Sequence, residues 1–436
     1  MKAKPADDPL SWTSLASIHQ QRCPHRNWYF LPWHRAYLAA FERACRNLSG
    51  KADFALPYWD WFIDRQLPEP FRGSANSGNI LWEDRPGFPE NASLPIETFG
   101  EATLERILAS EGFEAFGSSR PFNQNSLDSS WQRKSGASTE LEFGPHNNVH
   151  GILLGVMVSG LSPLDPIFWL HHCNVDRIWS LWTARHPTFA LDELFLGFEF
   201  ANDFTAVASD VPARVQKLLN TERLGYSYPP LLTIADVAEQ ITLQRVQAWQ
   251  SFDTSILGNQ SRFVALQGSG VGAGNGLPIL VAKSTQGGIA TRTQPLSIPF
   301  IAQQPIETLL GDLGNEQSGS AVVLTGPRRV VSFSRINFKH PPTDPGGRVH
   351  IFLNCDYLSP AIGPGDPHYV TTIAFFAGHD DHGAVTVQVD LTDTLATVRR
   401  NGDLTGKELV VQLMPAQSDD VEGSAVEVTS MTTTIL

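Results

Sequence analysis

Cysteine, positive charge and long apolar runs are all scarce in this sequence. Its four cysteines are too few and too widely spaced to form a disulfide framework. Lysine and arginine number 32 against 45 acidic residues, and the formal net charge of −13 argues against nucleic acid or an anionic membrane surface as a partner. No apolar stretch approaches the length of a membrane span, so we expect no membrane-embedded segment.

A secretory signal is also missing from the sequence as given. The N-terminal residues MKAKPADDPLSW lack the apolar core of such a signal, and cytoplasmic localisation is therefore the default expectation. The composition is ordinary for a folded protein, with 42% hydrophobic and 18% charged residues. A chain of 436 residues is long for one hydrophobic core and sufficient for two.

Two kinds of segment divide the chain. Up to about residue 228, apolar residues recur at helical spacing, as in Tyr37, Leu38 and Phe41, between long loops rich in proline and glycine. From residue 322 onward, β-branched runs such as RVHIFLNC and GAVTVQVDL are bounded by glycine, proline and aspartate, a pattern typical of a β-sandwich.

The sequence therefore predicts a multidomain α + β protein. We expect a mainly α-helical bundle with long loops over residues 1–228, which would be the catalytic domain. A linker with loops and a short helix near 235–250 would cover residues 229–321. A C-terminal β-sandwich would follow over residues 322–416, and a polar tail over 417–436.

Six histidines in two separated clusters are the most informative feature. The clusters are His19, His25 and His34, followed by His146, His150 and His172. Neutral imidazole is the commonest metal ligand of proteins, and six of them with few carboxylates or thiolates nearby suit copper better than magnesium, calcium or an iron–sulfur cluster. Two sets of three predict two metal ions that each keep an open coordination position, and hence a catalytic dicopper site.

The spacing within the second cluster supports this interpretation. His146 and His150 are four residues apart and would share one face of a helix, although such a pair by itself is more often a chance surface or core pair. His172 supplies a third imidazole at the start of another helical segment. Asp176, one turn later, would either accept a hydrogen bond from a ligand ring or form a salt bridge with an arginine. The adjacent His171 is expected to support the site or the core rather than to bind metal.

Cys23 stands two residues before His25. The simplest interpretation of a lone cysteine is a small buried hydrophobic residue. Copper and oxygen chemistry allow a second interpretation, in which the sulfur is bonded covalently to a carbon of the His25 ring. Such a bond would fix the ring in place before metal binds.

Two long segments resemble a known family. HRNWYFLPWHRAYLAAFE and DPIFWLHHCNVD are similar to the two copper-binding signatures of the type 3 copper proteins, which are tyrosinases, catechol oxidases and molluscan hemocyanins. GPHNNVHG and GYSY extend the resemblance over residues 8 to 228. It implies copper A bound by the first cluster, copper B bound by the second, dioxygen bound between the two copper ions, and an ortho-quinone as product. It also implies a thioether between Cys23 and His25.

The resemblance further assigns roles around copper B. In the tyrosinases that this chain resembles, a glutamate and an asparagine at the positions of Glu142 and Asn147 hold a water molecule that deprotonates a monophenol. A solvated loop carboxylate and a helix-start residue are the simpler alternative. Relatives with restricted access carry a bulky aromatic residue thirteen positions before the third ligand. This sequence has Ser159 there, which would leave the site open to substrate.

The C-terminal region resembles the β-sandwich that shields the copper site of molluscan hemocyanins and latent tyrosinases, as in HIFLNCDYLSPAIG and FFAGHDDHG. Tyr357 or Leu358 would be the side chain inserted into the site, although an ordinary interior residue of the sandwich is an equal alternative. The resemblance implies an enzyme that is latent until an activating protease removes this domain.

The expected function is that of a tyrosinase, which hydroxylates monophenols and oxidises ortho-diphenols with dioxygen at two copper ions. A catechol oxidase or an ortho-aminophenol oxidase without monophenolase activity would use the same ligands. A hemocyanin-like oxygen-binding protein is the alternative from another class, and Glu142, Asn147 and the small Ser159 argue against it. Small phenols are the expected partners, without nucleic acid or membrane, and the sequence leaves the oligomeric state open.

Overall fold

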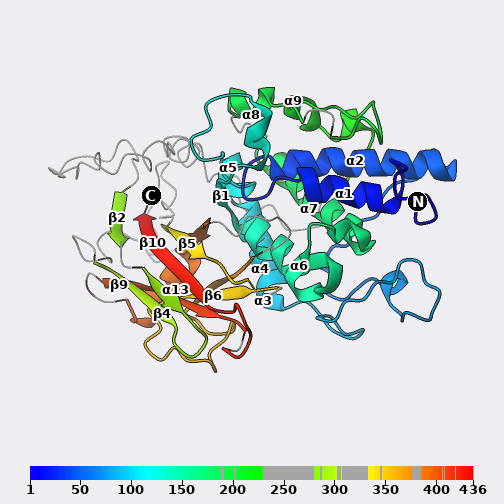
Figure 1. Cartoon of the computed structure of the whole chain (residues 1–436). Helices are drawn as coiled ribbons and strands as arrows, with labels where there is room; N and C mark the ends of the chain where they lie inside the picture. The colour runs from blue at the N-terminus through cyan, green and yellow to red at the C-terminus, as the bar shows by residue number, and fades with distance from the viewer. Residues whose placement is uncertain are drawn as a thin grey trace, which may run out of the picture. The chain divides into compact units, whose positions relative to one another are not determined.

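The computed structural model describes residues 1–187, 191–200, 203–228, 279–284, 287–301, 306, 332–343, 346–375, 384–404, 406, 408–417 and 419–435. It divides into two compact units, and Figure 1 follows the chain through them. The first unit comprises Met1–Thr233, Thr343–Arg348 and Ile373–Gly383, and the second comprises the remainder. The short helix predicted for the linker lies outside the described residues.

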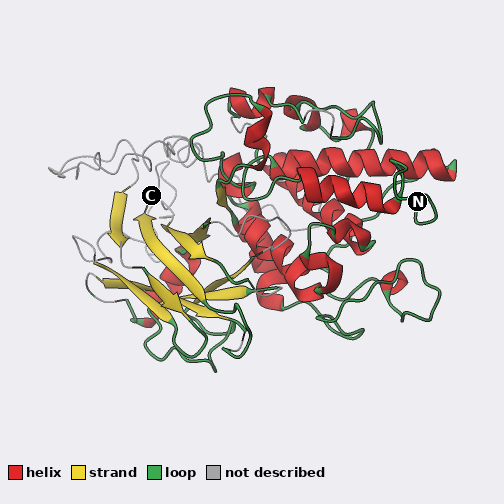
Figure 2. Ribbon diagram, viewed as in Figure 1, coloured by secondary structure: helices red, strands yellow, loops and turns green. Residues whose placement is uncertain are grey.

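Helices account for most of the regular structure in the first unit (Figure 2). They are α1 Trp12–Arg22, α2 Phe30–Ser49, α3 Ile96–Phe99, α4 Glu101–Leu108, α5 Phe113–Phe116, α6 Asn147–Leu153, α7 Ile167–Arg185, α8 Glu193–Gly197 and α9 Val215–Leu218. A π-helix, Glu142–His146, leads directly into α6, and a two-residue strand, β1 Ala137–Ser138, precedes it. Within the described part of the chain, none of the helices has the length and apolar character needed to cross a bilayer.

Helices α2 and α7 form the centre of this unit. Every residue of α7 from Ile167 to Trp179 is buried, as expected of a helix inside a core rather than on its surface. The two helices contact each other through the stacked rings of Phe41 and Trp169, whose centroids are 3.5 Å apart. Because α2 carries one predicted ligand and α7 another, this contact brings the two histidine clusters together.

Helix α1 is attached to the same core. It begins at a side-chain cap, in which Ser11 Oγ accepts a hydrogen bond from the Ser14 N–H. The Tyr37 hydroxyl on α2 donates to the Leu15 carbonyl at 2.6 Å, and the Trp12 indole donates to the Leu164 carbonyl at 2.9 Å. These contacts fix the helix that carries the first predicted ligand.

Two sheets make up most of the described second unit. One has the order β8 Val385–Asp390, β5 Ser332–His340, β10 Val426–Ile435 and β2 Ile279–Ser284, with β3 Gly288–Ala290 also paired to β10. The other has the order β4 Leu296–Ile301, β9 Glu408–Pro415, β6 Arg348–Leu353 and β7 Tyr369–Ala374. The pairs β5–β8, β5–β10, β4–β9 and β6–β9 are antiparallel. One helix, α13 Thr392–Asn401, follows β8 and ends at Gly402 with φ of 83°.

Helices in the first part and strands in the last part agree with the predicted α + β class, whereas the bundle and sandwich packing stay predictions. The prediction of a polar tail over residues 417–436 is wrong, because this segment contains the ten-residue strand β10, which lies between β5 and β2. Val426, Val428, Met431 and Thr433 of this strand are buried. Valine and threonine suit a pleated sheet, so a polar composition concealed a strand. Strands β2, β3 and β4 likewise lie in the segment predicted as a linker.

Candidate metal centre

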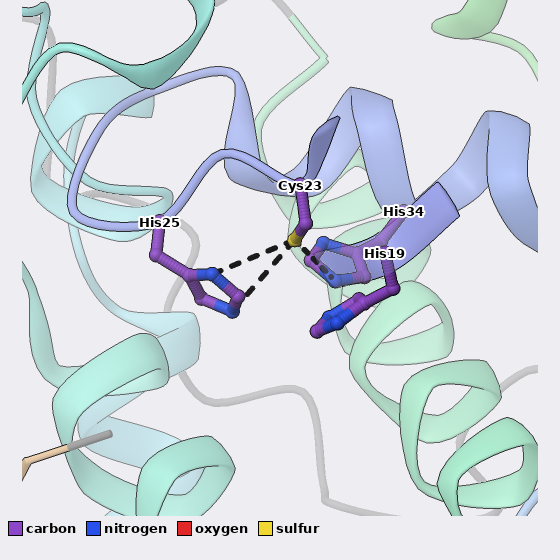
Figure 3. A group of neighbouring side chains, drawn as sticks. All are labelled: His19, Cys23, His25 and His34. Atoms are coloured by element: carbon purple, nitrogen blue, oxygen red, sulfur yellow. Dashed lines mark hydrogen bonds between the residues drawn. The ribbon is translucent and has the colours of Figure 1, made fainter. Parts of the chain in front are cut away.

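The first histidine cluster comes from α1, α2 and the segment between them. His19 lies on α1, His34 lies on α2, and Cys23 and His25 lie between the two helices. Figure 3 shows the four side chains converging, and their candidate ligand atoms lie within 4.8 Å of one another. His25 is half-buried and the other three are buried.

Backbone carbonyls determine which nitrogen of two of these rings can bind metal. The Nδ1 atoms of His19 and His34 each lie 2.8 Å from a carbonyl oxygen, that of Gly160 and that of Phe30 respectively. A carbonyl only accepts hydrogen bonds, so each Nδ1 carries the hydrogen and Nε2 keeps a lone pair. Metal-binding histidines are commonly oriented by such a bond.

Cys23 faces the carbon edge of the His25 ring. Its Sγ lies 3.5 Å from Nδ1 and 3.9 Å from Nε2 of His25, and the ring atom between these two nitrogens is Cε1 (Figure 3). The same sulfur lies 3.3 Å from Nε2 of His34. Burial raises the pKa of the Cys23 thiol well above its usual range, so the metal-free cluster contains a thiol rather than a thiolate.

The second cluster comes from the π-helix, α6 and α7. His146 ends the π-helix, His150 lies on α6, and His171 and His172 lie on α7; all four are buried, with candidate ligand atoms within 4.8 Å of one another. Pro145 lies inside the π-helix, a wide turn that is frequently found at functional sites. His150 Nδ1 lies 2.6 Å from the Met157 carbonyl oxygen, which leaves the lone pair of His150 on Nε2.

The adjacent residues His171 and His172 have different surroundings. The Trp61 indole N–H donates to Nδ1 of His171 at 3.1 Å, so a neutral His171 carries its hydrogen on Nε2. Among the described residues, neither ring nitrogen of His172 has a hydrogen-bond partner. His172 is therefore available as a ligand, whereas the lone pair of His171 on Nδ1 already accepts the Trp61 hydrogen bond. The supporting role of His171 stays a prediction.

The two clusters meet where α2 contacts α7. The rings of His34 and His172 stack with centroids 4.2 Å apart and planes at 7°. The His25 and His146 centroids are 5.6 Å apart. All six predicted ligands thus lie in one buried site of the first unit.

Burial controls the protonation of these rings. It lowers the pKa of His34, His146 and His172 well below the ordinary value, with a further contribution from the neighbouring imidazoles, and it lowers the pKa of His150 to about 4. The rings are neutral at physiological pH, which is the state that binds metal. Neutral, pre-oriented imidazoles form a donor set that fits copper.

Glu142 accepts hydrogen bonds from three protein donors. It is 2% exposed, its Oε1 accepts from the Arg26 N–H at 2.6 Å, and its Oε2 accepts from the hydroxyls of Ser118 at 2.6 Å and Ser138 at 3.0 Å. Burial raises the pKa of this carboxyl although the hydrogen bonds act in the opposite direction. A carboxylate has about four lone-pair positions, so three protein donors leave about one for a water molecule.

The Asn147 side chain is oriented at both of its polar atoms. Nδ2 donates to the Ala374 carbonyl at 2.8 Å, and Oδ1 lies 2.8 Å from Nδ1 of His146. Ala374 belongs to the late segment of the chain that the first unit includes. Because an amide oxygen accepts, His146 donates through Nδ1 and keeps its lone pair on Nε2. Asn147 therefore orients a predicted ligand, a contact that the sequence did not reveal.

Asp176 forms the salt bridge rather than a contact with a ligand ring. Its Oδ1 accepts from Arg35 Nε at 2.6 Å, and its Oδ2 accepts from the hydroxyls of Tyr226 at 2.6 Å and Tyr228 at 2.8 Å. The half-buried Ser159 donates to the Val156 carbonyl and accepts from the Leu161 N–H. Its short side chain is thus satisfied locally.

The two candidate plug residues belong to the second unit. Tyr357 is 53% exposed and its hydroxyl donates to Asp366. Leu358 is partly buried and packs against a small cluster of Phe352, Cys355 and Met414. A role for either residue at the copper site stays a prediction.

The sequence did not indicate the side chains that contact Asp176, His171 and Glu142. Arg35 directly follows a predicted ligand, and its charge on an otherwise apolar helical face was a usable signal for a buried ion pair. No such signal marked Trp61, because its partner His171 is distant in the sequence. None marked Ser118 or Ser138 either, because hydroxyl side chains are common in loops.

A family model described as the common central domain of tyrosinase matches residues 9–91 and 83–185. The tyrosinase of Streptomyces lincolnensis is 36% identical over 185 residues, which cover 38% of this chain and 67% of that protein. Tyrosinase HcTyr1 of Hahella sp. (strain CCB-MM4) is 30% identical over 294 residues, which cover 54% of this chain and 59% of that protein. The chain thus spans about three fifths to two thirds of the length of these relatives.

Solved structures share the fold. A latent aurone synthase (polyphenol oxidase) from natural source is similar with a TM-score of 0.62 at 18% identity, covering 100% of this chain and 84% of that one. Latent apple tyrosinase is similar with a TM-score of 0.57 at 21% identity, covering 100% of this chain and 92% of that one. At such identities the likeness concerns the fold alone.

Proposed function

Because the chain belongs to the tyrosinase family, we propose that it is a copper-dependent phenol oxidase, which uses dioxygen to hydroxylate monophenols and to oxidise ortho-diphenols to ortho-quinones. One observation carries the proposal. Two groups of three imidazoles meet in one buried site, where the rings of His34 and His172 stack at 4.2 Å. Each group would leave its metal an open coordination position for dioxygen or substrate.

The copper ions would supply the redox chemistry by passing electrons from the phenol to dioxygen. The residues of this chain would hold the ions. Copper A would bind Nε2 of His19, Nε2 of His34 and the ring of His25, and copper B would bind Nε2 of His146, Nε2 of His150 and the ring of His172. The hydrogen bonds at Nδ1 of four of these rings support this choice of nitrogens.

Glu142 and Asn147 would handle the phenol proton. The raised pKa of the Glu142 carboxyl makes it a stronger base than a surface glutamate. Its remaining acceptor position would hold the water that takes the hydroxyl proton from an incoming monophenol. Asn147 would keep His146 and that water oriented, and the small Ser159 would leave the approach to copper B open.

Cys23 and His25 would be joined by a thioether, which the position of the sulfur opposite Cε1 supports. The thiol hydrogen and the Cε1 hydrogen would leave as two protons, and dioxygen, the co-substrate of the proposed reaction, would accept the two electrons. The product is one carbon–sulfur bond and a peptide lighter by two hydrogens. Fixing the ring in this way would pre-organise copper A.

The C-terminal region would keep the enzyme latent, with its two sheets packed as a sandwich and Tyr357 or Leu358 as the shielding side chain. The fold is shared with two proteins described as latent. Cleavage by a protease near residue 230 should therefore raise turnover of bulky phenols. No rise after clean cleavage with copper retained would contradict latency.

The decisive experiment loads the protein with copper, cleaves the C-terminal region and compares turnover of tyramine, dopamine and 2-aminophenol. Turnover of tyramine as well as dopamine is expected. Dopamine turnover without tyramine turnover would reduce the function to that of a catechol oxidase, and 2-aminophenol turnover alone would indicate an ortho-aminophenol oxidase. Reversible oxygen binding without any turnover would favour an oxygen carrier.

A further inference from the structure

His25 is the one histidine of the first cluster that no helix carries. His19 and His34 lie on α1 and α2, whereas residues 23–29 between those helices have no regular structure. A helical side chain is oriented by the backbone hydrogen bonds of its helix. His25 needs other contacts to face His19 and His34.

The residue after His25 has an unusual backbone conformation. Arg26 has a φ of 61°, in the left-handed region that non-glycine residues avoid. Such a residue keeps this conformation only where its surroundings determine it. Two short hydrogen bonds do so here. The Arg26 N–H donates to Oε1 of Glu142, and the Arg26 carbonyl accepts from the Gly136 N–H, both at 2.6 Å.

Both contacts come from residues more than 100 positions away that are themselves fixed. Glu142 is held through its other oxygen by Ser118 and Ser138. A Cβ at position 136 would lie 2.6 Å from the carbonyl oxygens of Ser119 and Arg120, so only glycine allows the backbone to come this close. The two oxygens of Glu142 therefore have separate tasks, with Oε2 anchoring the side chain and Oε1 holding Arg26.

We propose that Glu142 is a positioning residue for copper A, because its hydrogen bond with the Arg26 N–H fixes the segment that carries His25. This hydrogen bond is called the latch below. The inference rests on the proposed function, since copper A is the ion that His25 would bind. It adds a second role to a residue for which only a role at the phenol proton was expected. The two roles use different properties, because the latch needs an acceptor atom at Oε1 and proton handling needs a carboxylate.

Variants of the full-length protein separate these roles. Glu142→Gln keeps an acceptor oxygen for the Arg26 N–H but has no carboxylate, and its amide can donate to the hydroxyls of Ser118 and Ser138. Glu142→Ala removes the latch. Ser138→Ala is the matched control, because it removes one hydrogen bond to Oε2 and leaves Arg26 in place. Each variant is loaded with copper(II), and copper per chain, the rate of copper loss to EDTA and phenol turnover are measured.

Glu142→Gln and Ser138→Ala are expected to lose copper at the wild-type rate. Glu142→Ala is expected to lose copper at least about tenfold faster, which is within the range that contacts supporting metal ligands contribute. Glu142→Gln is expected to lose monophenol turnover while it retains copper. Adding Arg26→Gly to Glu142→Ala should slow the loss again, because glycine adopts φ near 60° without a latch. If Glu142→Ala sped copper loss only by destabilising the fold in general, Arg26→Gly would not slow that loss.

Equal copper-loss rates in wild type and Glu142→Ala would overturn the latch, as would fast loss from Glu142→Gln or no effect of Arg26→Gly. If Glu142→Ala is insoluble, Glu142→Asp gives the same contrast, because the shorter side chain keeps the charge but does not reach Arg26. Wild type that binds two copper ions without oxidising any phenol would contradict the proposed function and leave the comparison of loss rates valid. Wild type that binds no copper would contradict both.

Discussion

The two histidine clusters reach the same site by different means. The ligands of the second cluster all lie on helical backbone, that of the π-helix, α6 and α7. The first cluster includes His25, which lies on no helix and whose neighbour Arg26 contacts Glu142 and Gly136. Helical backbone orients a ligand locally, whereas a ligand between helices needs other contacts, which here include residues distant in the sequence. The first cluster should therefore be the more easily disturbed.

Removing one ligand from each cluster should have the largest effect. His172→Gln and His19→Gln should each lower copper from two ions per chain to one and reduce phenol turnover at least about a hundredfold, the upper end of what supporting contacts alone achieve. Metal analysis and turnover with dopamine measure both effects. The control is His186→Gln, since His186 Nε2 contacts the Leu108 carbonyl away from both clusters. Two copper ions retained in either ligand variant would contradict the assignment of that ligand.

Asp176→Asn should lower the unfolding free energy and so affect both clusters equally. The reason is that Asp176 on α7 pairs with Arg35 on α2, and these two helices carry ligands of both clusters. Both side chains are at most 2% exposed, and the Arg35 guanidinium also stacks on Trp179 at 3.6 Å. Removing the charge leaves a buried arginine without its carboxylate, which costs about 3 kcal/mol of unfolding free energy or more. Urea unfolding of the copper-free protein measures this loss.

Asp210→Asn is the matched control for that substitution. Asp210 pairs with Arg43, but its side chain is 66% exposed, and exposed pairs contribute about 0–1 kcal/mol. Similar losses in the two variants would show that the contact between α2 and α7 does not depend on the buried pair.

The copper-free protein should lose stability as the pH falls from 6.5 towards 4. Burial lowers the pKa of His150 from the ordinary value of 6.5 to about 4. Between these values the unfolded chain has bound a proton that the folded chain has not, so acid favours unfolding by up to about 1.4 kcal/mol per pH unit for this one group. Glu142 acts in the opposite sense, because its raised pKa contributes stability at low pH that is lost as the pH rises.

Urea unfolding at pH 7.5 and pH 5 measures this dependence. His150→Gln should show a shallower fall in stability on acidification than wild type, and Glu142→Gln a steeper one. An unchanged pH dependence in His150→Gln would mean that His150 is protonated in the folded protein.

Local sequence patterns indicated the two histidine clusters more clearly than the contacts around them. Imidazoles at helical spacing, such as His146 and His150, are visible because both the residue type and the period are local. The contacts of Trp61 with His171, Glu142 with Arg26 and Asn147 with Ala374 join residues 110, 116 and 227 positions apart. Contacts between residues so far apart in the sequence leave no periodic pattern from which they could be predicted. Strand β10 was missed for another reason, because its threonines are polar in composition but suited to a sheet.

The smallest effects should come from the two cysteines beside the clusters, Cys23 and Cys173. Burial raises the pKa of both thiols well above the usual range, so burial does not distinguish them. Their neighbours do, because Cys23 Sγ lies 3.5 Å from a ring nitrogen of His25 and 3.3 Å from one of His34. Cys23→Ser should prevent the proposed thioether and speed copper loss severalfold, less than the tenfold expected when the hydrogen bond from Arg26 to Glu142 is removed.

Cys173→Ser should cost about 1 kcal/mol of unfolding free energy for burying a hydroxyl and leave copper binding unchanged. Peptide mass spectrometry detects the two hydrogens lost on thioether formation, and EDTA challenge gives the copper-loss rates. Comparable copper-loss rates in the two cysteine variants would show that Cys23 contributes no more to copper retention than Cys173 does. An unchanged loss rate in Cys23→Ser together with a thioether in wild type would mean that the contacts of Arg26 alone suffice to hold His25. The first cluster would then depend on its distant hydrogen bonds and not on the covalent bond beside it.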